Sequence, residues 1–149
     1  MLTSSLISLY ERDLIKVITE LNLYEYESDI WNIAPSINNS SGNLAMHLIG
    51  NLNTYIGAQL GHSGYVRDRP AEFSLKNIPR SKIIADLEEV LLTIKNVFIG
   101  LKSEDLQSNY PENVLGYEMS TEYFLIHLLA HLNYHLGQIN YHRRLITNE

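Results

Sequence analysis

Four of the six histidines lie close together near the end of the sequence, at positions 127, 131, 135 and 142. The first three recur every fourth residue, a spacing that places them on one face of an α-helix. Two imidazoles one helical turn apart can converge on one ion, each with its nitrogen about 2.0–2.1 Å from the metal. The spacing therefore predicts a divalent metal site on this helix.

Helix geometry limits which of these histidines can share an ion. His127 and His135 are separated by about 12 Å along the helix axis, too far for both to reach one metal. The site therefore uses either the pair His127 and His131 or the pair His131 and His135. A third ligand must come from elsewhere. We consider His47, which lies among apolar residues of another predicted helix, the first candidate and His62 a weaker one. Aligning the two helices by their starts brings His127 nearer to His47 than His135.

Other side chains near this site are predicted to support it. Gln138 lies one turn beyond His135 and could bind the outer nitrogen of a ligand imidazole or a bound water. Asn51, Tyr55 and the histidine at 127 are further candidates for pocket residues. No carboxylate lies on the histidine face, which disfavours a metalloprotease arrangement with an adjacent glutamate base. The catalytic residues, if any, are not identified by the sequence. His142 is expected to be solvated or at an interface.

Composition excludes several other functions. The chain has no cysteine, which excludes disulfides, iron–sulfur clusters, thiolate zinc ligands and a cysteine nucleophile. A balance of 11 Lys and Arg against 17 Asp and Glu argues against nucleic-acid binding. We expect neither a signal peptide nor a membrane span, and therefore a cytoplasmic protein. Arg67, Arg69 and Arg80 are interpreted as part of a solvated loop, with binding of a ligand carboxylate as the alternative.

The elements that must position these residues are helical. Residues 6–23, 41–60, 81–101 and 121–147 carry apolar side chains at helical spacing, and no strand-like alternation competes. Ser4 or Ser5 and Ser81 are predicted to cap two of the helices. The 149 residues fit one domain, residues 1–149. We predict an all-α fold, a four-helix bundle with long connecting loops that permit a non-sequential order of neighbours.

Residues 131–138 read H-x-x-x-H-x-G-Q, and a single histidine, His47, precedes them in the second predicted helix. In this motif, and in the number, order and length of helices over essentially the whole chain, the sequence resembles the DinB-like superfamily. Residues 57–69 resemble one uncharacterised branch of it. The resemblance implies a four-helix bundle of the DinB-like type, with His47, His131 and His135 as metal ligands.

Members of that superfamily with assigned activities include bacillithiol transferases and mycothiol-dependent isomerases. The resemblance therefore implies a metal-dependent enzyme, a thiol transferase or hydrolase acting on a small molecule. Because the chain lacks cysteine, any reacting thiol must come from a low-molecular-weight cosubstrate. Zinc or nickel is the expected ion, with manganese or iron as alternatives. Two other functions stay open: a non-catalytic metal-binding module, and a structural bundle. Apolar residues on more than one side of the last helix also predict a homodimer.

Overall fold

The computed structural model describes residues 2–148, and the regular elements in this range are all helical. They are α1 (Leu2–Leu23), the 3-10 helix η1 (Glu27–Trp31), α2 (Ser41–Leu52), the π-helix η2 (Asn53–Ala58), α3 (Arg69–Ser74), α4 (Arg80–Gly100), α5 (Ser103–Gln107) and α6 (Thr121–Thr147). The predicted all-α class is confirmed. Within the described range, no helix combines the length and apolar character that crossing a lipid bilayer requires.

The four predicted helical segments are present, but their ends differ from the prediction. Helix α1 begins at Leu2, so Ser4 and Ser5 lie inside the helix instead of capping it. Helix α4 begins at Arg80 with Pro79 at the N-cap position, so Ser81 is already helical. The three short helices η1, α3 and α5 lie in segments predicted to be loops. Five or six residues are too few to show an apolar helical period, which is why the pattern missed them.

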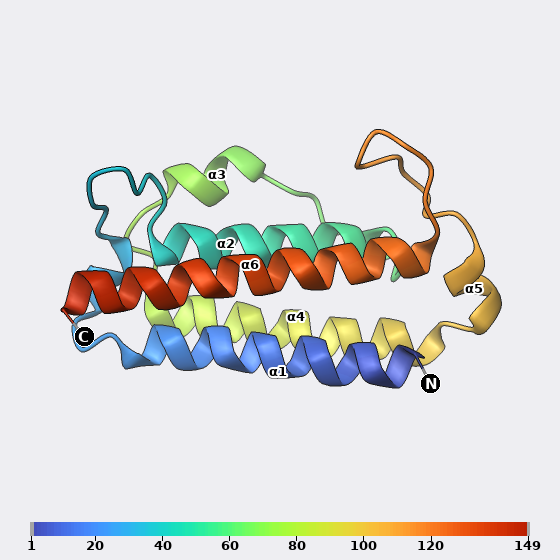
Figure 1. Ribbon diagram of the computed structural model, residues 1–149, viewed down its shortest axis with the longest axis horizontal. Helices are drawn as coiled ribbons and strands as arrows, with labels where there is room; N and C mark the ends of the chain where they lie inside the picture. The colour runs from blue at the N-terminus through green and yellow to red at the C-terminus, as the bar shows by residue number, and fades with distance from the viewer. Residues whose placement is uncertain (1, 149) are drawn as a thin grey trace.

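The four long helices lie alongside one another (Figure 1). Helix α1 packs against α4 and α6, and α2 packs against the same two helices. The helices α1 and α2, consecutive in the chain, are therefore diagonal to each other. Apolar residues from all four helices form one buried cluster between them. Within it the Tyr10 ring meets Phe98 edge-on at 5.4 Å between centroids, and the Tyr10 hydroxyl donates to the Leu125 carbonyl at 2.7 Å.

Helices α2 and α4 run in the same direction, whereas α6 runs antiparallel to α2 (Figure 1). Residues 59–79 must therefore return along the length of the molecule between α2 and α4. This return segment contains α3, which packs on α2. Asp68 caps α3 by accepting a hydrogen bond from the Ala71 backbone, and Pro70 lies in its first turn. The direction of the helices thus places residues 67–75 over the outer side of α2.

The start of α2 packs tightly against η1, and this contact gives a test of the fold. A Cβ on Gly42 would lie only 2.7 Å from the ring of Trp31, which is buried. We expect Gly42→Ala to lower the free energy of unfolding by about 1–3 kcal/mol, as for other overpacked sites. Urea denaturation followed by circular dichroism measures this loss.

The matched control is Gly100→Ala, because nothing lies within 4 Å of a Cβ at that position. It should leave stability unchanged or raise it by up to about 1 kcal/mol, since alanine is the better helix former. Equal effects of the two substitutions would contradict the packing of η1 on α2.

Candidate metal centre

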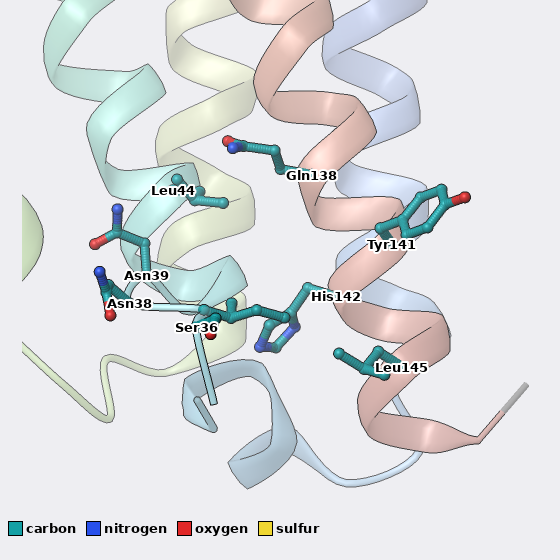
Figure 2. A pocket seen from close by; sticks show the side chains of 9 residues that line it. Ser36, Asn38, Asn39, Leu44, Gln138, Tyr141, His142 and Leu145 are labelled. Atoms are coloured by element: carbon teal, nitrogen blue, oxygen red, sulfur yellow. The ribbon is translucent and has the colours of Figure 1, made fainter. Parts of the chain in front are cut away.

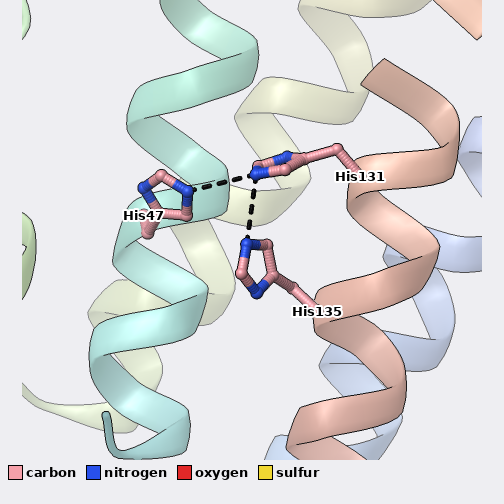
Figure 3. A group of neighbouring side chains, drawn as sticks. All are labelled: His47, His131 and His135. Carbon is pink, nitrogen blue, oxygen red and sulfur yellow. Dashed lines mark hydrogen bonds between the residues drawn. The ribbon is translucent and has the colours of Figure 1, made fainter. Parts of the chain in front are cut away.

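His47 from α2 and two histidines from α6, His131 and His135, meet between the two helices (Figure 3). The Nε2 atom of His131 lies 3.3 Å from Nε2 of His47 and 3.1 Å from Nε2 of His135. One ligand nitrogen from each residue lies within 4.8 Å of those of the other two. The structure therefore brings together the three histidines that the sequence resemblance implied as ligands, His47, His131 and His135, which we call the triad.

The spacing of these nitrogens matches ligands that share one ion. Two nitrogens bound at about 2.0–2.1 Å in tetrahedral geometry are about 3.3 Å apart. The two closest pairs in the triad, at 3.3 and 3.1 Å, are close to this value. The triad therefore has the donor atoms, and the separations between them, that a divalent ion requires.

In two of the imidazoles, the outer nitrogen Nδ1, which points away from the other two rings, lies within hydrogen-bond distance of an acceptor. Nδ1 of His47 lies 3.0 Å from Oε1 of Glu72, and Nδ1 of His135 lies 2.7 Å from Oε1 of Gln138. The Glu72 carboxylate, which is paired with Arg67, and the amide oxygen of Gln138 are acceptors, so each Nδ1 carries the proton and donates. Nη2 of Arg67 also approaches Nδ1 of His47, but at the longer distance of 3.3 Å. The inner Nε2 atoms of His47 and His135 are then unprotonated, and their lone pairs point toward His131.

His131 cannot satisfy both of these lone pairs. A neutral imidazole carries one N–H, so His131 can donate to one neighbour at most. Its own Nδ1 is buried and has no hydrogen-bond partner. At least one contact in the triad therefore brings two lone pairs together unless a cation lies between them. This arrangement fits a metal ion, and it predicts that each histidine binds through Nε2.

The partner of His47 is fixed by the return segment between α2 and α4. Glu72 is buried, and its carboxylate accepts from Nε and Nη2 of Arg67 at 2.8 and 2.9 Å. Gly50 leaves the space that this carboxylate occupies, because a Cβ there would overlap it. The Asn43 side chain donates to the backbone carbonyls of Glu72 and Leu75 at 2.9 and 2.8 Å, which anchors α3 on α2. The packing of this segment thus orients the His47 ring.

Glu72 was not identified from the sequence, and its pairing with Arg67 was not predicted. Arg67 was interpreted as solvated, but its side chain is mostly buried and forms an ion pair with Glu72 at 2.8 Å. Both residues lie in a segment without periodicity, and the contact to His47 spans 25 residues. Gly50 within an apolar helix is the local signal that a side chain could approach this part of α2 closely.

Burial lowers the pKa of all three triad histidines from the ordinary value. For His131 the pKa falls to about 4, mainly because of burial and further because of His135 and His47. For His47, burial outweighs the opposing effect of the hydrogen bond that its Nδ1 donates to Glu72. The three imidazoles are therefore neutral at neutral pH, the form in which imidazole binds metal.

The other two candidate histidines, His127 and His62, do not join the triad. His127 stacks on Phe124, with 5.8 Å between ring centroids, and lines a cavity beside His131. His62 is exposed and has a positive φ of 53°. Because α6 runs antiparallel to α2, the start of α2 lies beside the later half of α6, which brings His135 and not His127 to His47.

The sequence predicted that His142 is solvated or at an interface, but its side chain is buried within the chain, because η1 and the segment after it cover it. Its Nε2 lies 2.7 Å from the Asn32 carbonyl, which can only accept, so this nitrogen carries the proton. Its Nδ1 then accepts from the hydroxyl of Tyr24 at 2.6 Å or of Ser41 at 3.0 Å. Burial is the main cause that lowers the pKa of His142. This histidine therefore joins α6 to α2 and to the segments that follow α1 and η1, and it is structural.

A cavity of about 190 Å³ opens beside the triad. It is lined by His47, Asn51, Tyr55, Arg67, Arg69, Val114, Phe124, His127, Leu128 and His131. Asn51 is buried, and its Oδ1 has no hydrogen-bond partner. The Arg67 guanidinium lies over the Tyr55 ring, 5.8 Å from its centroid. The sequence-predicted pocket residues Asn51, Tyr55 and His127 thus border this cavity, whereas Gln138 lies on the other side of His135.

The chain matches no model of a known protein family and no curated protein sequence. The function is therefore argued from the geometry of the triad and its cavity.

Substitution of single histidines tests which of them bind the ion. His47→Ala, His131→Ala and His135→Ala should each weaken zinc binding by orders of magnitude, because each removes one of three ligands. Glu72→Gln should cost about 10- to 100-fold, as is typical for a residue that orients a ligand. Competition titration with a chelator at fixed pH measures these affinities.

His127→Ala is the matched control, since it removes a histidine from the same helix without removing a triad nitrogen. Its zinc affinity should stay within about tenfold of the wild type. Loss of binding in this variant, with His135→Ala near the wild-type affinity, would show that the site lies one turn earlier.

The lowered pKa values also set how metal affinity depends on pH. Protons compete with the ion only below the pKa of each imidazole, and all three lie below the ordinary value of about 6.5. Zinc affinity should therefore be independent of pH from about 8 to 6.5 and decrease only at lower pH. Titrations corrected for protonation of the competing chelator measure this profile. An affinity that already decreases tenfold per pH unit above pH 6.5 would contradict the burial of the triad.

Proposed function

We propose that this chain is a metal-dependent enzyme of the thiol-transferase or hydrolase type that acts on a small molecule. One divalent ion would be held by Nε2 of His47, His131 and His135. The observation that carries the proposal is the convergence of these three nitrogens, with the outer nitrogens of two of the rings held by Glu72 and Gln138. Such an arrangement brings lone pairs together unless a cation is bound.

We further propose that the fold is a four-helix bundle of the DinB-like type. Two features support this assignment. The triad takes one histidine from the second long helix and two from the last, as the resemblance implies. The glutamine of the H-x-x-x-H-x-G-Q motif, Gln138, accepts a hydrogen bond from Nδ1 of His135 at 2.7 Å. This contact orients the His135 ring and so explains why a glutamine follows the second histidine at this spacing.

An ion held by three neutral imidazoles supplies Lewis acidity toward a thiolate, a carbonyl or a water at its open positions. Three nitrogen ligands suit zinc or nickel, with manganese or iron as the alternatives. Because the chain has no cysteine, a thiol at this position comes from a cosubstrate. The cavity of about 190 Å³ beside His47 and His131 is where the substrate would bind.

Several residues of the cavity offer polar groups that could bind a substrate or transfer a proton. Arg69 is exposed at the cavity edge and can bind a carboxylate of the substrate. The Tyr55 side chain can donate a hydrogen bond, and the unpartnered Oδ1 of Asn51 can accept one. His127 lines the same cavity and is not a triad member, so it is free of the ion and can transfer a proton.

A non-catalytic metal-binding role is the second candidate. It is favoured by one observation: among the described residues no carboxylate lines the cavity, so no acidic general base faces a substrate bound there. Binding of an external ligand to the ion separates the two functions, because an enzyme needs an open position and a structural site does not.

Purified protein should contain about one divalent ion per chain, measured by elemental analysis after expression in metal-replete medium. The cobalt-substituted protein should change its visible spectrum on addition of a small thiol, because an external thiolate enters an open position. Thiol conjugation to an electrophile and ester hydrolysis are the two activities to assay. Arg69→Ala should keep the metal content and raise KM, while the exposed Lys82→Ala, on α4, should change neither.

The outcomes separate the candidates. Less than a tenth of an equivalent of metal, with no uptake on titration, would reject the metal site. A full equivalent of metal with no spectral change on thiol addition and no activity in either assay would support the non-catalytic role instead.

A further inference from the structure

The outward face of α6 carries an apolar stripe along the whole helix. We call it the outer stripe, and it consists of Tyr123, Ile126, Ala130, Tyr134, Gly137, Tyr141 and Leu145. Successive members are three or four residues apart, so all seven lie within an arc of about 100°. The five large residues expose 51%, 48%, 65%, 71% and 54% of their surface, in chain order. Exposed apolar surface that is continuous in this way indicates an interaction site.

The outer stripe lacks the charges that a solvated helix face normally has. Between Glu122 and Arg143, α6 contains no Asp, Glu, Lys or Arg. Helix α4 shows the contrast, because its exposed side carries several charged residues, among them Lys82, Glu88 and Glu89. A solvent-exposed helix face is usually charged or polar, so the outer face of α6 is suited to contact with protein.

Gly137 adds an independent observation. Glycine in the middle of a helix is less stable than alanine, so it needs a reason. Packing within residues 2–148 gives none, because no atom of this range lies within 4 Å of a Cβ built at this position. A small residue on an exposed helix face permits close approach of another helix, and Ala130, two turns earlier on the same stripe, has the same property.

We propose that two copies of this chain associate through α6, with the two helices antiparallel about a two-fold axis near residues 133 and 134. The stripe is self-complementary about this point. Tyr123 of one copy faces Leu145 of the other, Ile126 faces Tyr141, and Ala130 faces Gly137. A two-fold interface requires this reciprocity, since each surface patch must fit itself.

Charge complementarity specifies the direction. Glu122 and Arg144 lie at opposite ends of the stripe, and the midpoint between them is residue 133. In the antiparallel arrangement, Glu122 of each copy lies beside Arg144 of the other at both ends of the interface. A parallel arrangement would place like charges together, which is unfavourable. The antiparallel direction also places the opposite ends of the two helix dipoles side by side.

The exposed area of the stripe is close to the lower size limit of stable dimer interfaces. A fully covered tyrosine buries about 150–250 Å², so the exposed parts of the three tyrosines with Ile126 and Leu145 amount to roughly 500 Å² per chain. Two copies thus approach the lower limit of stable interfaces, about 1,200 Å² in total. Figure 2 shows Tyr141 on α6 and Leu145 one turn beyond it. Both border a cavity of about 310 Å³, whose other wall is residues 36–39 and Leu44. Tyr123 of the second copy lies at this level, and the cavity leaves room for its ring.

Sedimentation equilibrium at tens of micromolar tests the association. The wild type should give about 34 kDa, twice the chain mass of 17.1 kDa. Tyr134→Glu should give about 17 kDa, because it places two carboxylates together at the two-fold axis. Ile99→Glu is the matched control, an even more exposed apolar position on α4, and should remain dimeric. Circular dichroism verifies that the variants are folded. A monomeric wild type, or a dimeric Tyr134→Glu, would overturn the proposal.

Disulfide trapping tests whether the two α6 helices are antiparallel. Because the chain has no cysteine of its own, only the introduced cysteines can cross-link. A mixture of Ala130→Cys and Gly137→Cys chains, one carrying a mass tag, should form tagged–untagged dimers on oxidation. Each variant alone should not cross-link, because identical positions lie about 10 Å apart along antiparallel helices. Cross-linking of Ala130→Cys alone, without the mixed product, would show a parallel dimer and overturn the proposed arrangement.

Discussion

The site depends on one constraint: the outer nitrogens of two imidazoles are occupied, so their inner lone pairs must point at the same place. Glu72 accepts from Nδ1 of His47, and Gln138 accepts from Nδ1 of His135. His131 lies between them with a single proton to give. Because burial also lowers the pKa of each ring, protonation is a poor way to relieve this contact at neutral pH. A divalent cation relieves it for all three rings at once.

The direction of the helices produces this constraint. Since α2 and α4 are parallel, the chain must return between them, and the return segment brings Arg67 and Glu72 onto α2. A buried carboxylate is costly unless it is paired and hydrogen-bonded. Arg67 supplies the opposite charge, and Gly50 supplies the space. The connection between two helices therefore also orients a ligand, and the same segment forms part of the wall of the adjacent cavity.

Helix α6 presents three different faces, which explains its unusual composition. One face packs into the core through residues such as Leu128, Leu132 and Ile139. The second carries His131 and His135 toward α2, and the third carries the outer stripe. None of the three suits a charged side chain, so charges are confined to the two ends of the helix. If the outer stripe pairs two copies, α6 is at once core, ligand support and interface.

The sequence by itself determined the all-α class, the four long helices and the shared face of the histidines on α6. These follow from the helical repeat, which is a local property of the chain. It also indicated Gln138 as a partner of a ligand imidazole, because the two lie within one turn. Only the tertiary structure decided between His127 and His135, placed Glu72 on His47, and buried His142 beneath η1. These contacts join residues 25 to 110 positions apart. They depend on the direction and register of packed helices, which no local periodicity contains.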